Sequence, residues 1–177
     1  MKKTIIRIII LLSAVLLQVS FVNILTPSNY NLNIVLLLTV AWIFIVDFEK
    51  IWLWILILGI LTDIVNGNMA INIFYFLTLI YLVSFISKRI LIDRYMYKLF
   101  LAIFIISVFF LTNMVVDMFA SGKFNIGLFL EQIKSKIFLT IYFKNILINA
   151  VGFCLVYYVL NKIENETTKS RKMNYDL

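Results

Sequence analysis

The sequence has no histidine, one cysteine, one proline and only five glycines among its 177 residues. Without an imidazole, the chain lacks the side chain that proteins use most for general base catalysis and metal binding near neutral pH. The lone Cys154 has no second cysteine with which to form a disulfide or a Cys-x-x-Cys metal site. We therefore expect a non-enzymatic protein that holds no metal and no cofactor.

Charged residues are also scarce. They make up 14% of the chain, whereas 63% of the residues are hydrophobic and the mean hydropathy is +1.03. A soluble domain has roughly 25% charged and about 45–50% apolar residues, so this composition indicates a membrane protein. The net charge of +7 does not indicate nucleic-acid binding, because the basic residues are scattered at the ends of apolar runs instead of forming a patch.

Six apolar runs, each bounded by charges or turn residues, divide the chain. About 20 apolar residues cross a bilayer as a helix, and shorter runs do so with interfacial extensions. The sequence therefore predicts an all-α integral membrane protein with one six-helix transmembrane domain over residues 1–163 and a polar, disordered cytoplasmic tail over 164–177. The predicted spans cover residues 5–25, 32–46, 51–65, 69–87, 99–119 and 137–160.

The basic residues predict the orientation of these spans. Twelve of the sixteen lie near the start of the chain, at Lys50, in the connection over 88–98, or after residue 160. Cytoplasmic flanks of membrane helices carry an excess of Lys and Arg, so both termini are predicted to be cytoplasmic. We expect a multi-pass protein of the bacterial cell membrane.

A few polar residues interrupt the predicted spans near their non-cytoplasmic ends. Asp63, Asp117 and Lys144 fall at a similar depth, where Lys144 would pair with either carboxylate. Alternatively, the carboxylates reach the headgroups and Lys144 extends to the interface along its own stem. The predicted outer-side polar cluster comprises Asp63, Asn113, Asp117, Lys144, Asn145 and Asn149.

Small and polar residues also share one stripe of the third span. Gly59, Asp63 and Gly67 stand at i, i+4 and i+8, and Asn72 follows in the next apolar run. Glycine lets two membrane helices approach closely, which is the usual basis of their association in lipid. We interpret Gly59, Asp63, Gly67 and Asn72 as a helix-packing motif, and packing is favoured over ligand binding.

Two further segments carry predictions of their own. Residues 124–136 are too short and polar to span a bilayer, and their apolar residues recur at helical spacing. Either an interfacial helix or an irregular loop fits that pattern. Trp42, Trp52 and Trp54 bracket the charged turn at 47–50 and are interpreted as a cytoplasmic aromatic belt.

The stretch GILTDIVNGNMAIN at residues 59–72 resembles the rod shape-determining protein MreD family. That family typically shows Gly-x-x-x-Asp followed by a small turn with a glycine, which Gly59, Asp63 and Gly67 match. Ala70 stands where a second glycine is expected, and Lys144 departs from the pattern of the last span. The resemblance implies a membrane component of the cell-elongation complex that helps to link MreC and the MreB cytoskeleton to peptidoglycan synthesis.

The MreD fold is similar to that of the substrate-binding subunits of energy-coupling-factor vitamin transporters, which gives an alternative function. In that case Asp63, Asp117, Lys144 and the asparagines of the polar cluster would contact a vitamin in an outward-facing pocket. The first span lacks the Ala-x-x-x-Ala pattern expected of those subunits around Ser13 and Ala14.

Overall fold

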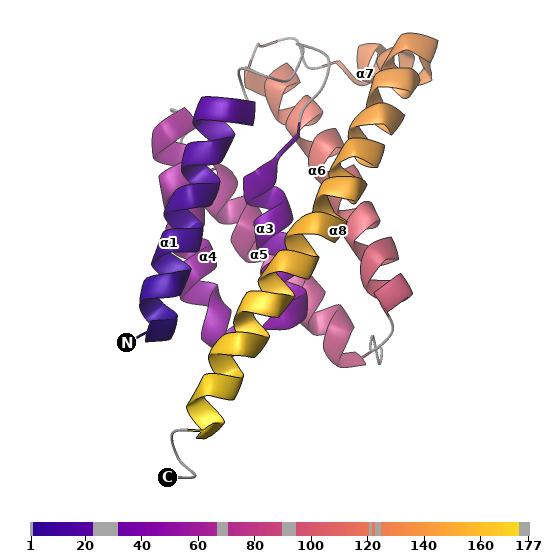
Figure 1. Ribbon diagram of the computed structural model, residues 1–177. Helices are drawn as coiled ribbons and strands as arrows, with labels where there is room; N and C mark the ends of the chain where they lie inside the picture. Colours follow the sequence, from indigo (N-terminus) through magenta and orange to yellow (C-terminus); the bar gives the residue numbers. More distant parts are fainter. Residues whose placement is uncertain are drawn as a thin grey trace.

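The computed structural model describes residues 2–22, 32–66, 71–89, 95–120, 122 and 125–173 (Figure 1). Regular structure in these residues is entirely helical, which confirms the all-α prediction. The elements are α1 (Lys2–Leu17), the π-helical segment η1 (Gln18–Val22), α3 (Ile34–Ile45), α4 (Phe48–Asn66), α5 (Ile71–Arg89), α6 (Tyr95–Ala120), α7 (Ile126–Lys134) and α8 (Lys136–Met173).

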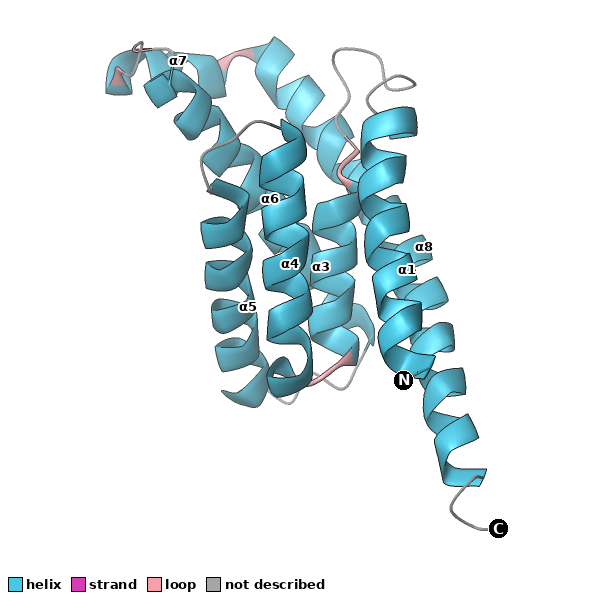
Figure 2. Cartoon of the chain, turned by 90° about the vertical axis from the view of Figure 1, so that its left-hand side faces the viewer, coloured by secondary structure: helices cyan, strands magenta, loops and turns pink. Residues whose placement is uncertain are grey.

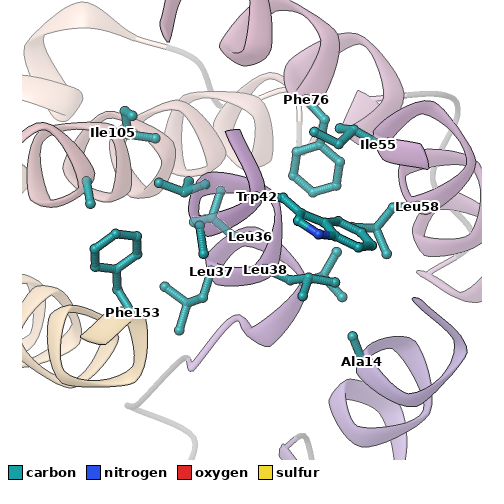
Figure 3. Close-up of a cluster of buried hydrophobic side chains, with 14 of the residues drawn as sticks. Ala14, Leu36, Leu37, Leu38, Trp42, Ile55, Leu58, Phe76, Ile105 and Phe153 are labelled. Atoms are coloured by element: carbon teal, nitrogen blue, oxygen red, sulfur yellow. The ribbon is translucent and has the colours of Figure 1, made fainter. Parts of the chain in front are cut away.

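The short helix α3 forms the centre of the bundle. It contacts α1, α4, α5, α6 and α8, and every residue from Val35 to Trp42 is buried. A helix that is apolar on all sides must be covered on all sides, and the neighbouring helices cover α3 in this way. The stretch contains a single polar residue, Thr39. Its hydroxyl donates to the carbonyl oxygen of Val35 at 2.9 Å. Figure 3 shows Trp42 beside Leu58 of α4, and Phe153 of α8 on another side of α3.

The five helices around α3 form a ring that is unevenly closed. Direct packing is extensive between α1 and α4, between α4 and α5, and between α6 and α8. The other two neighbouring pairs pack less directly, and we call their boundaries the α1–α8 seam and the α5–α6 seam. The first seam is bridged by polar side chains and the second is lined by apolar ones, as described below.

The start of α1 and the end of α8 lie at the same end of the bundle, and α7 lies at the opposite end in both views (Figures 1 and 2). We refer to these as the terminal end and the α7 end. The predicted six-span topology requires the two termini to share one side. The arrangement of the helices is consistent with that requirement, and the spans themselves remain predictions.

Two stretches of the described helices are long and apolar enough to cross a membrane, Met96–Val116 and Lys136–Glu166. All six predicted runs overlap helices. These helices leave large apolar side chains on the surface: Phe74 is 76% exposed, Ile64 71% and Leu147 67%. An apolar surface of this kind suits contact with lipid or with another protein more than contact with water.

The structure corrects two of the sequence predictions. The tail from residue 164 onward is predicted to be disordered, but α8 continues as a helix to Met173. Glu164 explains part of the extension, because its carboxylate is held by a buried arginine of α1. Trp42 is 0% exposed and has no place in an interfacial belt, and its Nε1 has no hydrogen-bond acceptor among the described residues. Residues 126–134, of the segment predicted as helix or loop, are helical.

Candidate functional site

Gly59 and Asp63 join α4 to α5 at the α7 end. A Cβ added to Gly59 would lie 2.9 Å from the Cα of Ile73, so only glycine allows this close approach of the two backbones. Asp63 is 4% exposed, and its Oδ2 accepts a hydrogen bond of 3.0 Å from the backbone N–H of Ile73. That N–H belongs to the first turn of α5, where the helix offers no partner of its own. Gly59 and Asp63 thus fix both the close spacing between α4 and α5 and the start of α5.

The other two residues of the predicted packing motif are not placed in the same way. Gly67 and the side chain of Asn72 lie outside the described residues. The neighbouring Thr62 is 7% exposed, and its hydroxyl donates to the carbonyl oxygen of Leu58 at 2.7 Å. The polar groups described beside Gly59 therefore bind the backbone of the bundle.

Asn149 of α8 holds the start of the central helix. It is 0% exposed, and its Oδ1 accepts from the backbone N–H of Asn33 at 3.0 Å. Its Nδ2 donates to the carbonyl oxygen of Asn145 one turn earlier, at 2.9 Å. Asn33 is in turn the N-cap of α3, because its Oδ1 accepts from the N–H of Leu36 at 2.9 Å.

Gln18, the first residue of η1, completes this arrangement from the end of α1. Its side-chain amide donates to the carbonyl oxygen of Leu32 at 3.1 Å and accepts from the N–H of Ile34 at 2.7 Å. Gly152 lets α8 pack tightly against α3, since an added Cβ would lie 2.7 Å from Cδ1 of Leu37. Side chains from both sides of the α1–α8 seam therefore meet the same backbone segment, at the α7 end of α3.

The predicted outer-side polar cluster divides between different helix starts. Asp63 serves the start of α5, whereas Asn145 and Asn149 lie beside the start of α3. Lys144 is exposed on α8 and Asn113 is half-buried on α6. The side chain of Asp117 lies outside the described residues, so its pairing with Lys144 stays a prediction.

A buried ion pair at the terminal end closes the same α1–α8 seam. Arg7 Nε lies 3.0 Å from Glu164 Oε1, and their side chains are only 11% and 8% exposed. Arg7 Nη1 also donates to the carbonyl oxygen of Lys50 at 3.2 Å, so one guanidinium connects α1, α4 and α8. From the sequence, Arg7 is one of the basic residues near the start of the chain that predict the topology. A charge one turn inside an apolar run was the signal that it had a partner.

α6 and α8 are joined by two polar contacts of their own. The hydroxyls of Ser107 and Tyr142 share a hydrogen bond, and Tyr142 also donates to the Ser107 carbonyl oxygen at 3.2 Å. Nearer the terminal end, Lys98 Nζ donates to the Tyr157 hydroxyl at 3.2 Å. These contacts reinforce a helix pair that already packs directly.

The α5–α6 seam contains a groove of about 580 Å³. Tyr75 and Phe109 meet at the inner side of the seam with ring centroids 4.8 Å apart, and Val83 and Ile105 are 2% and 6% exposed. The rim is open, since Phe74 and Phe104 are 76% and 63% exposed. The groove is thus a feature of the outer surface, separated from α3 by a packed layer.

In the part of the chain that the structure describes, no three acidic or cysteine side chains lie close enough to hold a metal ion. Comparisons with family models, with curated proteins and with solved structures found no match for this chain. The function must therefore be inferred from the residues and their arrangement.

Proposed function

We propose that the protein is a non-enzymatic membrane component of the bacterial cell-elongation complex. In this role it helps to maintain rod shape by linking MreC and the MreB cytoskeleton to peptidoglycan synthesis. The proposal follows the resemblance of residues 59–72 to the MreD family. It includes a scaffold with six transmembrane helices and both termini in the cytoplasm.

Two features support the six-span topology. Twelve of the sixteen basic residues lie at alternate connections of the apolar runs or near the chain ends, and the start of α1 and the end of α8 share one end of the bundle. The long helices also expose large apolar side chains along their length, for example Leu147 and Leu155 of α8 at 67% and 65%. A bilayer covers such surfaces without the unfavourable hydration that water imposes.

The observation that carries the functional proposal is the engagement of Asp63. Its carboxylate is buried and accepts from the N–H of Ile73 beside the close contact at Gly59. The family-like motif therefore has a structural use within the α4–α5 pair. In the vitamin-binding alternative, Asp63 would contact a ligand instead of the backbone. Asn149 also contacts backbone, because it accepts from the N–H of Asn33 at the start of α3. Both contacts favour the scaffold.

Depletion of the protein in a rod-shaped host tests the proposal. We expect the cells to become round as the protein is lost, and expression of the wild-type chain to restore rods. Asp63→Leu should restore them poorly, because it leaves the N–H of Ile73 without its acceptor. The matched control is Ile64→Leu, at the neighbouring position that is 71% exposed. Depleted cells that remain rods would contradict the proposal.

A binding experiment tests the alternative separately. Thiamine, riboflavin and biotin are titrated against the purified protein while its tryptophan fluorescence is recorded. We expect no saturable quench from any of the three. A saturable response that Asp63→Asn abolishes would favour the vitamin-binding subunit instead.

A further inference from the structure

Four lysines depart from the charge pattern that predicts the topology. Twelve of the sixteen basic residues lie on the predicted cytoplasmic side, and the other four are Lys123, Lys134, Lys136 and Lys144. All four fall around α7, in a stretch of sequence whose one acidic residue is Glu131. Lys and Arg are normally in excess on the cytoplasmic side, so a basic cluster at the α7 end requires an explanation of its own.

α7 is a short helix that leads directly into α8. Asn125 is its N-cap, because its Oδ1 accepts from the N–H of Gly127 at 2.8 Å. Ser135 alone separates α7 from α8, and its Oγ accepts from the N–H of Phe138 at 3.1 Å. Figure 2 shows α7 lying across the long direction of the bundle. The two caps therefore fix α7 crosswise at the start of a helix that is long and apolar enough to span a membrane.

One side of α7 is apolar. Its stripe has residues at i, i+3, i+4 and i+7, namely Ile126, Phe129, Leu130 and Ile133, whereas Leu128 falls on the other side. Phe129 and Ile133 are half-buried, which indicates that the stripe faces the rest of the bundle. Ile126 and Leu130 form the other edge of the stripe and are 66% and 50% exposed. Water would hydrate this edge unfavourably.

The charged residues of α8 place α7 at the level of the lipid headgroups. Lys136 and Lys162 are both exposed, and the 26 residue steps between them correspond to about 39 Å of helix at roughly 1.5 Å per residue. A bilayer with its headgroups measures about 40–45 Å, so a spanning α8 has one of these lysines in each headgroup region. α7 ends two residues before Lys136 and therefore lies in the non-cytoplasmic headgroup region.

The apolar edge of α7 continues into the exposed surface of α8. Ile137 directly follows the turn and is 75% exposed, and Phe143 and Leu147 extend the surface at 64% and 67%. Acyl chains cover both parts of this surface at once. The exposed Lys134 and Lys136 lie beside it, where a lipid phosphate offers the charged partner that an ammonium group binds well.

We propose that α7 lies in the non-cytoplasmic interface of the bilayer, with its apolar stripe against acyl chains, and that Lys134 and Lys136 bind the phosphate groups of anionic phospholipids. Glu131 is exposed on α7, and with two lysines against one carboxylate the segment keeps a net positive charge. This inference rests on the six-span topology proposed above, and it adds a lipid-binding surface to the scaffold.

Spin labels on the full chain in lipid nanodiscs test the position of α7. Cys154→Ser removes the native thiol, and Leu130→Cys in the stripe or Glu131→Cys outside it then carries the label. An interfacial helix buries its apolar face about 5–10 Å into the acyl boundary, so the ratio of oxygen to water-soluble nickel chelate collisions should be about threefold or more higher at 130 than at 131. Leu155→Cys, at a 65% exposed position of α8, should report hydrocarbon and shows that the bundle is inserted.

Lipid selectivity tests the two lysines. A nitrobenzoxadiazole fluorophore at Leu130→Cys is quenched by spin-labelled phosphatidylglycerol or, at the same mole fraction, by spin-labelled phosphatidylcholine. We expect about twofold or more stronger quenching by phosphatidylglycerol, because lysines near the surface attract anionic lipid. Lys134→Gln with Lys136→Gln should abolish this preference. Lys50→Gln with Lys162→Gln, at exposed positions of the terminal end, removes the same charge and should leave it unchanged.

Four outcomes would overturn the proposal. Equal access of the nickel chelate to 130 and 131 would place α7 in water, and shielding of both labels from both reagents would place it within protein contacts. Equal quenching by the two lipids, or a preference that survives the Lys134 and Lys136 substitutions, would remove the anionic headgroup contact. Nickel access at position 155 would overturn the topology as well, whereas rod shape in depleted cells addresses only the cellular role.

Discussion

The two seams of the helix ring are closed by different means. In the α1–α8 seam, Arg7 and Glu164 pair at the terminal end, and Gln18 and Asn149 bind the start of α3 at the other. In the α5–α6 seam, the groove walls are apolar and the two threonine hydroxyls bond within their own helices. One seam is specified by polar contacts within the chain, and the other is left available to an apolar neighbour.

This difference shows how a membrane bundle specifies its internal packing. Lipid is as apolar as the side chains, so apolar surfaces alone do not determine which helices meet. Buried hydrogen bonds and ion pairs do so, because an unpaired polar group is costly away from water. Substitutions in the α1–α8 seam should therefore destabilise the isolated protein, and substitutions in the α5–α6 groove should not.

The largest effect is expected from Arg7→Ala. It removes the guanidinium that donates to the buried Glu164 carboxylate and to the Lys50 carbonyl oxygen, and breaking a buried ion pair costs about 3–5 kcal/mol. The free energy of unfolding in mixed detergent micelles measures the loss. Glu164→Ala should cost a similar amount, and the double variant should cost less than the two together.

Lys50→Ala is the control for this prediction. The Lys50 ammonium lies 2.5 Å from Asp47 Oδ2, but the two side chains are 66% and 75% exposed. The hydrogen bond and charge of Asp47 raise the pKa of Lys50, so the ammonium group stays charged at neutral pH. Because solvent screens exposed pairs, we expect no measurable change in stability. Equal losses for Arg7→Ala and Lys50→Ala would show that burial of the first pair has no energetic importance.

Gly59→Ala should have the next largest effect. Its new Cβ would meet the Cα of Ile73 at 2.9 Å, and backbone has little freedom to move away, so we expect a loss of about 1–3 kcal/mol. Gly152→Ala is the comparison. Its Cβ would meet the ends of the Leu37 and Leu32 side chains, which move more easily than backbone, and the loss should be smaller. The reverse order in the same unfolding experiment would contradict the close α4–α5 approach.

Asn149→Leu breaks the α1–α8 seam at its other end. The N–H of Asn33 loses its acceptor, and interhelical hydrogen bonds in membranes contribute up to about 1–2 kcal/mol. We expect a loss of about that size, together with faster hydrogen exchange at Asn33. Asn165→Leu, in the exposed part of α8, is the control. Unchanged exchange at Asn33 would show that Asn149 does not hold the start of α3.

Local patterns in the sequence predicted the features that a single helix determines. Runs of apolar residues located the helices, and Gly59 with Asp63 at i and i+4 indicated a packing stripe on α4. The pattern did not reveal the partner of Asp63, because a carboxylate beside small residues suits a helix start, an ion pair or a ligand equally well.

Features that depend on distant parts of the chain were not predictable in this way. Arg7 and Glu164 are separated by 157 residues, and the polar composition after residue 160 suggested a tail. Only the position of α8 beside α1 turns Glu164 into a buried partner. The interpretation of Trp42 was wrong for the same reason. The charged turn at 47–50 is compatible both with an interfacial tryptophan and with one that α4 and α5 enclose. The α5–α6 groove likewise arises from the ring as a whole.

The smallest effect is expected in the α5–α6 seam itself, from Thr112→Leu. The Thr112 hydroxyl bonds only to the Val108 carbonyl oxygen of its own helix, which keeps its intrahelical partner after the substitution. The added apolar atoms extend into an open groove and displace no packed side chain. We therefore expect the free energy of unfolding to change by less than about 0.5 kcal/mol. Ile106→Asn, at a 0% exposed position of the same helix, should destabilise the protein clearly by comparison. If Thr112→Leu instead destabilised the chain as strongly as Asn149→Leu, the α5–α6 seam would be closed by internal packing, and the contrast between the two seams would fail.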